Sequence, residues 1–214
     1  MHNQEIIIDP PVSGNWVIYN PPGHPAVAFD FLAEDEKKSL YSKGSFLRHL
    51  VSFISVGDTY TWTSPIYSPI DGVVVDSHGV EKDRKKISFI YDLFSLLINK
   101  PKESEGFGMF GGNYITIKSG DFYVLLCHLK EGSVNIKKGD VIRSGQQIAE
   151  AGNSGSSIQP HLHIQVMKNG QYFPLFKNLL PFKISSGKIK EGDIWAMRKN
   201  INLKNKTHYL FESA

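Results

Sequence analysis

The amino-acid sequence predicts a mainly β fold, an antiparallel β-sandwich or open barrel with an inserted helix and a peripheral C-terminal extension. Short runs of bulky and alternating residues follow one another along the chain, and glycine-containing turns separate them. One stretch, residues 86–100, instead repeats its apolar side chains at helical spacing. The chain has 214 residues, 41% of them hydrophobic, which is enough for one domain with elaborations.

The expected strands begin near the N-terminus and recur up to residue 173. Turn signals such as Ser-Pro-Ile-Asp, Ser-Gly and Asn-Gly separate them. In chain order the predicted strands are residues 15–20, 26–32, 71–78, 112–119 and 121–129, two short strands within 139–152, and a strand, turn and strand over 161–173.

Residues 86–100 predict an inserted helix that lies on the sheet, and Lys100-Pro101 end its apolar repeat. Residues 34–53 change from polar to apolar, which favours a loop with a helical turn. The last ~35 residues are rich in Lys and Asn with scattered aromatic residues, which indicates a peripheral extension.

These boundaries predict two parts of unequal size. The main domain covers residues 1–180 and carries an insertion at about 79–110. The C-terminal extension covers residues 181–214 and packs on or near that domain.

Composition narrows the classes of partner. The net charge is +3, and the densest basic stretch, Glu-Lys-Asp-Arg-Lys-Lys at 81–86, is diluted by acids, so we expect a solvated loop and no nucleic-acid partner. The single cysteine, Cys127, excludes an intrachain disulfide and, in its apolar run, is expected to be a buried structural thiol. No run approaches the ~18 apolar residues of a membrane span.

The stretch Gly-Asn-Ser-Gly-Ser-Ser-Ile-Gln-Pro-His-Leu-His-Ile-Gln-Val, residues 152–166, carries the strongest chemical signal. In a β-strand, residues two apart point to the same face, so His161 and His163 are expected side by side. Two adjacent imidazoles suit a metal or acid–base site. On the residues alone, two ordinary polar side chains on a solvated strand face remain the more common interpretation of such a short motif.

Three further polar residues stand on neighbouring predicted strands or turns. Asp30 lies on the alternating strand 26–32, and His24 follows a Pro-Pro-Gly turn. His128 ends the strand 121–129, where a lone histidine on an apolar strand is commonly a core residue. The residues by themselves leave two interpretations open. Asp30 and His24 are either metal ligands, or Asp30 is an exposed acid on its strand and His24 an ordinary loop histidine.

The motifs quoted above, together with Gly-Asn-Tyr-Ile-Thr at 112–116 and Lys-Lys-Gly-Asp-Val-Ile-Arg-Ser-Gly-Gln at 137–146, closely resemble the lysostaphin/LytM-type zinc metallopeptidases. The resemblance is clear over residues 64–78 and 111–174. It implies the β fold of that family, a zinc-dependent endopeptidase activity on peptidoglycan cross-links or stem peptides, and one zinc ion per chain. The substrate is then peptidoglycan or a related peptide; the oligomeric state stays open.

Carried over to this chain, the resemblance implies that His24, Asp30 and His163 bind zinc. It makes His128 and His161 the non-ligand catalytic histidines. The spacing of His24 and Asp30 departs from the family's commonest His-x-x-x-Asp motif, because five residues separate them. His49 and His78 are alternative third ligands, and His78, after a strand, is the stronger alternative.

The glycine-rich loop before the histidine pair is expected to line the substrate cleft, since glycine lets the backbone approach a ligand closely. The predicted cleft residues are Asn113, Asn153, Ser154 and Gly155. The alternative is a plain turn between strands. A helical zincin is excluded, because no His-Glu-x-x-His motif is present, and no Gly-x-Ser-x-Gly elbow supports a serine hydrolase.

The resulting hypothesis is a zinc-activated water that attacks a peptide carbonyl, with His161 or His128 orienting or deprotonating it. The alternative is a non-catalytic domain of the same type that binds and activates another wall hydrolase. A barrel-shaped carrier domain is a third class, but the lysine of a lipoyl or biotinyl hairpin is missing. The resemblance implies a periplasmic or extracellular location, although the N-terminus lacks the regions of a signal peptide.

Overall fold

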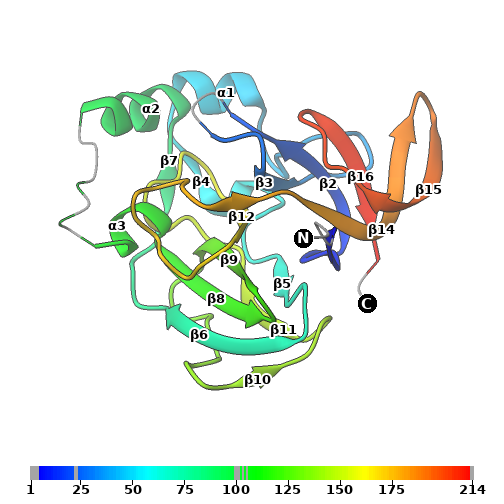
Figure 1. The fold of residues 1–214 in the computed structure, drawn as a ribbon. Coiled ribbons are helices and arrows are strands. Elements are labelled where there is room, and N and C mark those ends of the chain that lie inside the picture. Colours follow the sequence, from blue (N-terminus) through cyan, green and yellow to red (C-terminus); the bar gives the residue numbers. More distant parts are fainter. Residues whose placement is uncertain (1–4, 22–23, 99–101, 103, 105, 213–214) are drawn as a thin grey trace.

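The computed structural model describes residues 5–21, 24–98, 102, 104 and 106–212. Its main feature is one large sheet that is flanked at one end by two helices (Figure 1). The twelve strands of this sheet are β1 (Ile6–Ile8), β2 (Gly14–Tyr19), β3 (Ala28–Ala33), β6 (Gly72–His78), β8 (Asn113–Ser119), β9 (Phe122–Leu129), β10 (Val141–Ile142), β12 (Leu162–Met167), β13 (Leu179–Leu180), β14 (Phe182–Glu191), β15 (Ile194–Ile201) and β16 (Thr207–Phe211).

Shorter elements complete the fold. Two small sheets pair β5 (Pro65–Tyr67) with β11 (Gln147–Glu150) and β4 (Ile54–Ser55) with β7 (Lys86–Ile87). The helices are α1 (Phe46–Val51), α2 (Phe89–Ile98), α3 (Gly108–Gly111) and a 3₁₀ turn, Val56–Asp58. No helix among the described residues has both the length and the apolar character that crossing a membrane requires.

The large sheet runs in the order β1-β14-β16-β2-β3-β12-β9-β8-β6-β10, with β13 beside β12 and β15 beside β14. The mainly β class that the sequence predicts is therefore confirmed. The sheet is mixed rather than wholly antiparallel, because β1 pairs with β14 in parallel. The eight expected strands up to residue 166 are all present, with shifts at their ends.

The second strand expected after the Asn169-Gly170 turn is absent, and this part of the prediction is wrong. Residues 171–178 form no strand, and the chain returns to β12 only at β13. Two causes are visible. The Tyr172 hydroxyl makes hydrogen bonds to Asp76 at 2.7 Å and to Thr116 at 2.9 Å, and these contacts hold the segment in a position where it does not pair with β12. Pro174 then lacks the amide hydrogen that a ladder needs.

The inserted helix is present as α2, but it starts at Phe89 rather than at residue 86. Lys86 and Ile87 pair with β4 instead, and the Asp92 carboxylate accepts a hydrogen bond from the Ser88 amide at the helix start. Its predicted end at Lys100-Pro101 lies outside the described residues. The helical turn expected within 34–53 is α1.

The predicted boundary at residue 180 stays a prediction. Strands β14 and β16 extend the same sheet rather than forming a second one, since β16 pairs with β2. Tyr209 and Phe211 of β16 are buried in the core that also holds Trp16 and Phe31. Residues 182–211 therefore complete the main core.

The two faces of the sheet differ in character. One face buries the main hydrophobic core, which includes Ile115, Leu126 and Ile164 from the three central strands. The opposite face carries the side chains that alternate with these, among them Asp30 and His163. The polar site is thus built on a rigid sheet whose other face is fully packed.

Candidate metal centre

Asp30 and His163 are neighbours because their strands pair. They are directly opposite each other in the antiparallel ladder of β3 and β12. Side chains at opposite positions of such a ladder lie close together on one face. The His163 Nδ1 atom lies 2.8 Å from Asp30 Oδ1, and both residues are buried.

His24 reaches the same point from a turn that precedes β3. The His24 amide donates to the Pro21 carbonyl at 3.0 Å, and the Ala28 amide donates to the Pro25 carbonyl at 3.1 Å. The Asn20 side chain ties this turn by donating to the Pro25 and Ala28 carbonyls, both at 2.7 Å. The turn takes up the additional residues between His24 and Asp30, so the longer spacing still brings both side chains together.

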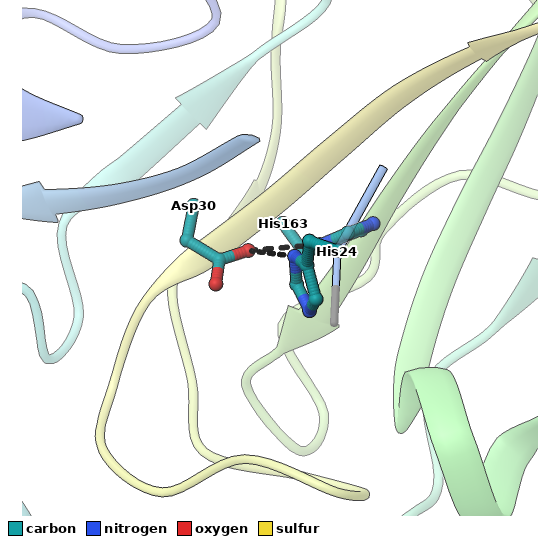
Figure 2. Close-up of side chains that lie close together, drawn as sticks. All are labelled: His24, Asp30 and His163. Carbon is teal, nitrogen blue, oxygen red and sulfur yellow. Dashed lines mark hydrogen bonds and ion pairs between the residues drawn. The ribbon is translucent and has the colours of Figure 1, made fainter. Parts of the chain in front are cut away.

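The three side chains converge on one small volume (Figure 2). His24 Nδ1 lies 3.8 Å from Asp30 Oδ1, and the rings of His24 and His163 meet edge to face with centroids 5.1 Å apart. One ligand atom from each residue lies within 4.8 Å of the other two. Two imidazoles and a carboxylate form a donor set that zinc commonly uses at catalytic sites.

One donor atom of the cluster lacks a hydrogen-bond partner in the described part of the chain, as a ligand that awaits a cation would. His24 Nδ1 is buried and has no hydrogen-bond partner among the described residues. Burial lowers the pKa of His24 to about 4, although the Asp30 charge acts in the opposite direction. A neutral imidazole with a buried, unbonded nitrogen is a metal ligand in the required protonation state.

Asp30 is held as a carboxylate at this site. Burial by itself raises its pKa, but the neighbouring His161 and the hydrogen bond from His163 outweigh burial, and the pKa lies well below its ordinary value. His163 shifts in the opposite direction: burial lowers its pKa, yet the bond to Asp30 raises it above the ordinary value. In this structure a proton on His163 Nδ1 thus bridges the two groups, and metal binding there would release it.

His161 and His128 lie beside this cluster, and their Nε2 atoms make no hydrogen bond to the described residues. His161 Nδ1 lies 2.8 Å from the Gln159 carbonyl, and His128 Nδ1 lies 2.9 Å from the Ser154 carbonyl. Because a carbonyl only accepts, both Nδ1 atoms carry the proton. His161 Nε2 lies 3.7 Å from Asp30 Oδ1, and the His128 and His161 rings are 4.5 Å apart.

The His128 imidazole is adapted to remain neutral. Burial lowers its pKa well below the ordinary value, and the nearby His161 acts in the same direction. Its backbone has a φ of 61°, a strained left-handed conformation for a residue with a side chain. This conformation occurs at the end of β9, where the chain leaves the sheet and the imidazole joins the site.

The predicted cleft residues form the support behind His128. Asn113, Asn153 and Ser154 are fully buried. The Ser154 hydroxyl accepts a bond from the Asn113 amide and donates to the Leu129 carbonyl, at 2.9 and 2.7 Å. At Gly155 an added Cβ would lie 2.3 Å from the Gly112 amide nitrogen. Contact of these residues with a substrate stays a prediction, while their contacts with one another fix the loop.

The two alternative ligands lie elsewhere. His49 is buried in α1 and bonds the Tyr41 hydroxyl at 2.8 Å. His78 stacks on Tyr114 and lies 3.3 Å from Glu81 Oε1. Neither belongs to the His24, Asp30 and His163 cluster.

Several polar residues that the sequence did not single out support the histidines. Gln165 Oε1 lies 3.1 Å from His163 Nε2, and Ser157 Oγ lies 3.1 Å from His161 Nδ1. The Tyr41 hydroxyl donates to Gln159 Oε1 at 3.2 Å, one residue before Pro160 and the histidine pair. The alternation of β12 could have indicated Gln165, which is two residues beyond His163. No local pattern indicates Tyr41.

Comparison with known proteins finds one family model and several relatives. Residues 100–174 match the family model of Peptidase family M23. The peptidoglycan DD-endopeptidase ShyA of Vibrio cholerae is 28% identical over 117 residues, which are 51% of this chain and 27% of that protein. Lysostaphin of Staphylococcus staphylolyticus is 33% identical over 104 residues, 48% of this chain and 22% of that protein.

Among solved structures, a crystal structure of a zinc containing peptidase from Vibrio cholerae aligns with a TM-score of 0.38 and 20% identity. The alignment covers 76% of this chain and 35% of that chain. The present chain spans about a quarter of the length of the two curated relatives. The matched segment contains His128, His161 and His163, three of the five polar residues at the candidate centre. Residues 100–174 therefore resemble peptidase family M23, and the chain is similar over part of its length to the peptidoglycan endopeptidase ShyA and to lysostaphin.

Proposed function

We propose that this chain is a zinc-dependent endopeptidase that hydrolyses peptide bonds in peptidoglycan cross-links or stem peptides. The observation that supports this most is the convergence of His24, Asp30 and His163 within 4.8 Å, with a buried free nitrogen on His24. The relatives named as peptidoglycan endopeptidases support the substrate class. A zinc ion held by these three residues would supply an activated water, because bound zinc lowers the pKa of water toward ~7.

The non-ligand histidines are proposed to move and stabilise charge. His161 offers a bare Nε2 atom beside Asp30 and is the proposed acceptor for the proton of the attacking water. His128 is fixed by Ser154 through its Nδ1 proton and is neutral in the free protein. It is proposed to stabilise the oxyanion that forms on the substrate carbonyl once its Nε2 atom has taken up a proton, because a bare Nε2 cannot donate a hydrogen bond. Asp30 remains ionised as a ligand and orients the His163 ring.

The first experiment measures zinc content by elemental mass spectrometry and digestion of purified peptidoglycan in parallel. Wild type is expected to hold about one zinc per chain and to release peptides. His163→Ala is expected to lose both zinc and digestion. His78→Ala is the matched control, because this histidine is outside the cluster and bonds the surface residue Glu81.

Each departure from this result has a defined meaning. A well-folded wild type that holds no zinc after zinc is added back would overturn the proposal. A wild type that binds zinc but digests no peptidoglycan would overturn the enzymatic part and favour a wall-binding domain. Zinc loss in His78→Ala with retention in His24→Ala would show that the third ligand is misassigned.

A further inference from the structure

The helices α1 and α2 expose an unusual share of the chain's large hydrophobic side chains. Among the described residues, eighteen large hydrophobic side chains are exposed, and nine of them fall within residues 46–53 and 89–98. We call these nine the α1–α2 surface: Phe46, Leu47, Val51, Phe53, Ile90, Tyr91, Leu93, Phe94 and Ile98. An apolar concentration of this kind marks an interaction site rather than the ordinary background of scattered exposed residues.

Ring contacts join the two parts of this surface. The Phe46 ring lies against the Phe89 ring with centroids 5.8 Å apart, and the exposed rings of Phe53 and Tyr91 are 5.3 Å apart. Both contacts join α1, or the residues that follow it, to α2. Figure 1 shows the two helices together at one end of the molecule, at the end away from β10.

The outward orientation of these side chains is held by contacts on the inner side. Asp92, on the buried side of α2, binds Arg84 at 2.6 Å and the Ser88 amide at 2.9 Å. His49, on the buried side of α1, binds Tyr41 and packs edge to face on Phe89. The apolar side chains therefore face outward on anchored helices.

Neither helix exposes an acidic side chain, although Asp58, whose carbonyl accepts from the Lys43 amide, is partly exposed beside them. Helix α1 contains no acidic residue, and the only acid of α2, Asp92, is buried and paired. Exposed basic side chains stand on or beside the helices at Lys43, Arg48 and Lys86. An apolar surface with aromatic residues and a basic border is complementary to an anionic lipid surface.

The dimensions indicate how such a surface would sit on a membrane. Helix α2 has 10 residues, about 15 Å at the usual rise, against a hydrocarbon core of about 30 Å. On a membrane, α2 would therefore lie in the interfacial region and would not cross the hydrocarbon core. A second copy of this chain fits less well, since a symmetric contact would bring Arg48 and its basic neighbours of both copies together.

We propose that the α1–α2 surface docks the protein on the surface of a membrane that contains anionic lipid. The inference rests on the exposed side chains and charges, and it does not depend on the proposed peptidase activity. Tyr41 bonds both His49 of α1 and Gln159, two residues before His161, so docking would place the lipid surface on the side of the molecule from which α1 is linked to the candidate centre.

The test is co-sedimentation of the full chain with vesicles of phosphatidylcholine, with and without phosphatidylglycerol. Wild type is expected to bind the phosphatidylglycerol vesicles at least about tenfold more tightly, and added salt is expected to weaken this binding. The double variant Leu47→Glu with Phe94→Glu is expected to lose binding about tenfold or more. The matched control is Val141→Glu with Ile194→Glu, which are 79% and 72% exposed but lie on β10 and β15.

Circular dichroism and thermal unfolding establish that each variant is folded. Absence of wild-type binding to either vesicle would overturn the proposal, and so would equal losses in the two double variants. Light scattering tests a second copy as the partner. This surface would be assigned to a second copy if the wild type self-associates but binds no vesicle, and if Leu47→Glu with Phe94→Glu makes the protein monomeric. Arg48→Glu with Lys86→Glu is expected to remove the preference for phosphatidylglycerol, and an unchanged preference would contradict the charge argument.

Discussion

Tyr41 connects the buried side of α1 to the proposed catalytic histidine. Gln159 Oε1 only accepts, so the Tyr41 hydroxyl donates to it and accepts from His49 Nδ1. Burial raises the pKa of Tyr41 to about 12 and lowers the pKa of His49, so both stay neutral near pH 7. The Gln159 carbonyl in turn fixes the His161 tautomer. Tyr41 is therefore a positioning residue for His161.

Replacement Tyr41→Phe removes the hydrogen bond to Gln159 and keeps the ring. We expect turnover of peptidoglycan to fall roughly tenfold while zinc content and KM stay near their wild-type values, as for other outer partners of a site. Tyr60→Phe is the control, because the Tyr60 hydroxyl reaches only the surface residue Asp35, at 3.4 Å. Equal activity in both variants, or loss of zinc in Tyr41→Phe, would contradict a positioning role.

The sequence could predict those site residues that stand in a recognisable motif. The alternation of a strand and the resemblance to the lysostaphin/LytM type point to His161 and His163, and both now face Asp30. The longer spacing left His24 ambiguous, because the Asn20 contacts that fold its turn have no sequence pattern. Tyr41 and Gln159 are 118 positions apart, which is why no local rule could pair them.

At the scale of elements, the glycine-rich loop and the start of β8 pack backbone against backbone. Gly112 has a φ of 62° and an added Cβ would lie 2.3 Å from Ser154 Oγ and 2.5 Å from the Ser154 backbone carbon. Glycine is needed at this position for conformation and for space together. The sequence predicted that this loop approaches a substrate, and that stays a prediction. The structure shows that the loop packs against Gly112.

Two glycine substitutions separate these two requirements. Gly132 has a φ of 72° but open space around its added Cβ, so Gly132→Ala is expected to cost about 1–2 kcal/mol of unfolding free energy. Gly112→Ala adds the clash with Ser154 and is expected to cost at least about 2 kcal/mol more. Urea unfolding of both variants measures the difference, and equal costs would show that the loop yields freely.

The order of elements was predictable where strands are close in sequence and bounded by turn signals. The hairpin of β8 and β9 across Ser119-Gly120 is such a case. The prediction of a strand after Gly170 failed, because the Tyr172 hydroxyl makes hydrogen bonds to Asp76 on β6 and Thr116 on β8. Both partners are distant in the sequence, so a local residue pattern cannot indicate these contacts.

At the scale of the whole molecule, the C-terminal strands are part of the same packed sheet. Tyr209 is fully buried, stacks on Phe211 with centroids 5.5 Å apart, and is opposite Trp16 in the ladder of β16 and β2. The sequence predicted a peripheral extension because its composition is polar. The alternation that buries Tyr209 and Phe211 is too short to stand out against that composition.

Tyr209→Ala tests how far the core depends on this segment. Removal of a buried aromatic ring is expected to lower the unfolding free energy by about 3–5 kcal/mol. Met197→Ala on β15, where the side chain is 53% exposed, is expected to stay within about 0.5 kcal/mol of wild type. Thermal and urea unfolding compare the two, and a Tyr209→Ala variant as stable as Met197→Ala would support an independent extension.

The pairing of β1 with β14 and of β2 with β16 also sets an order of events during synthesis. Ile6 meets Phe182 and Gly14 meets Phe211, so each contact joins residues that leave the ribosome far apart in time. Contacts of such long sequence separation make folding slow, because the intervening chain must be ordered first. Strand β1 therefore has no strand partner, and β2 has one unpaired edge, until β14 and β16 emerge. In that interval the nascent chain is most exposed to misassembly and most dependent on chaperones.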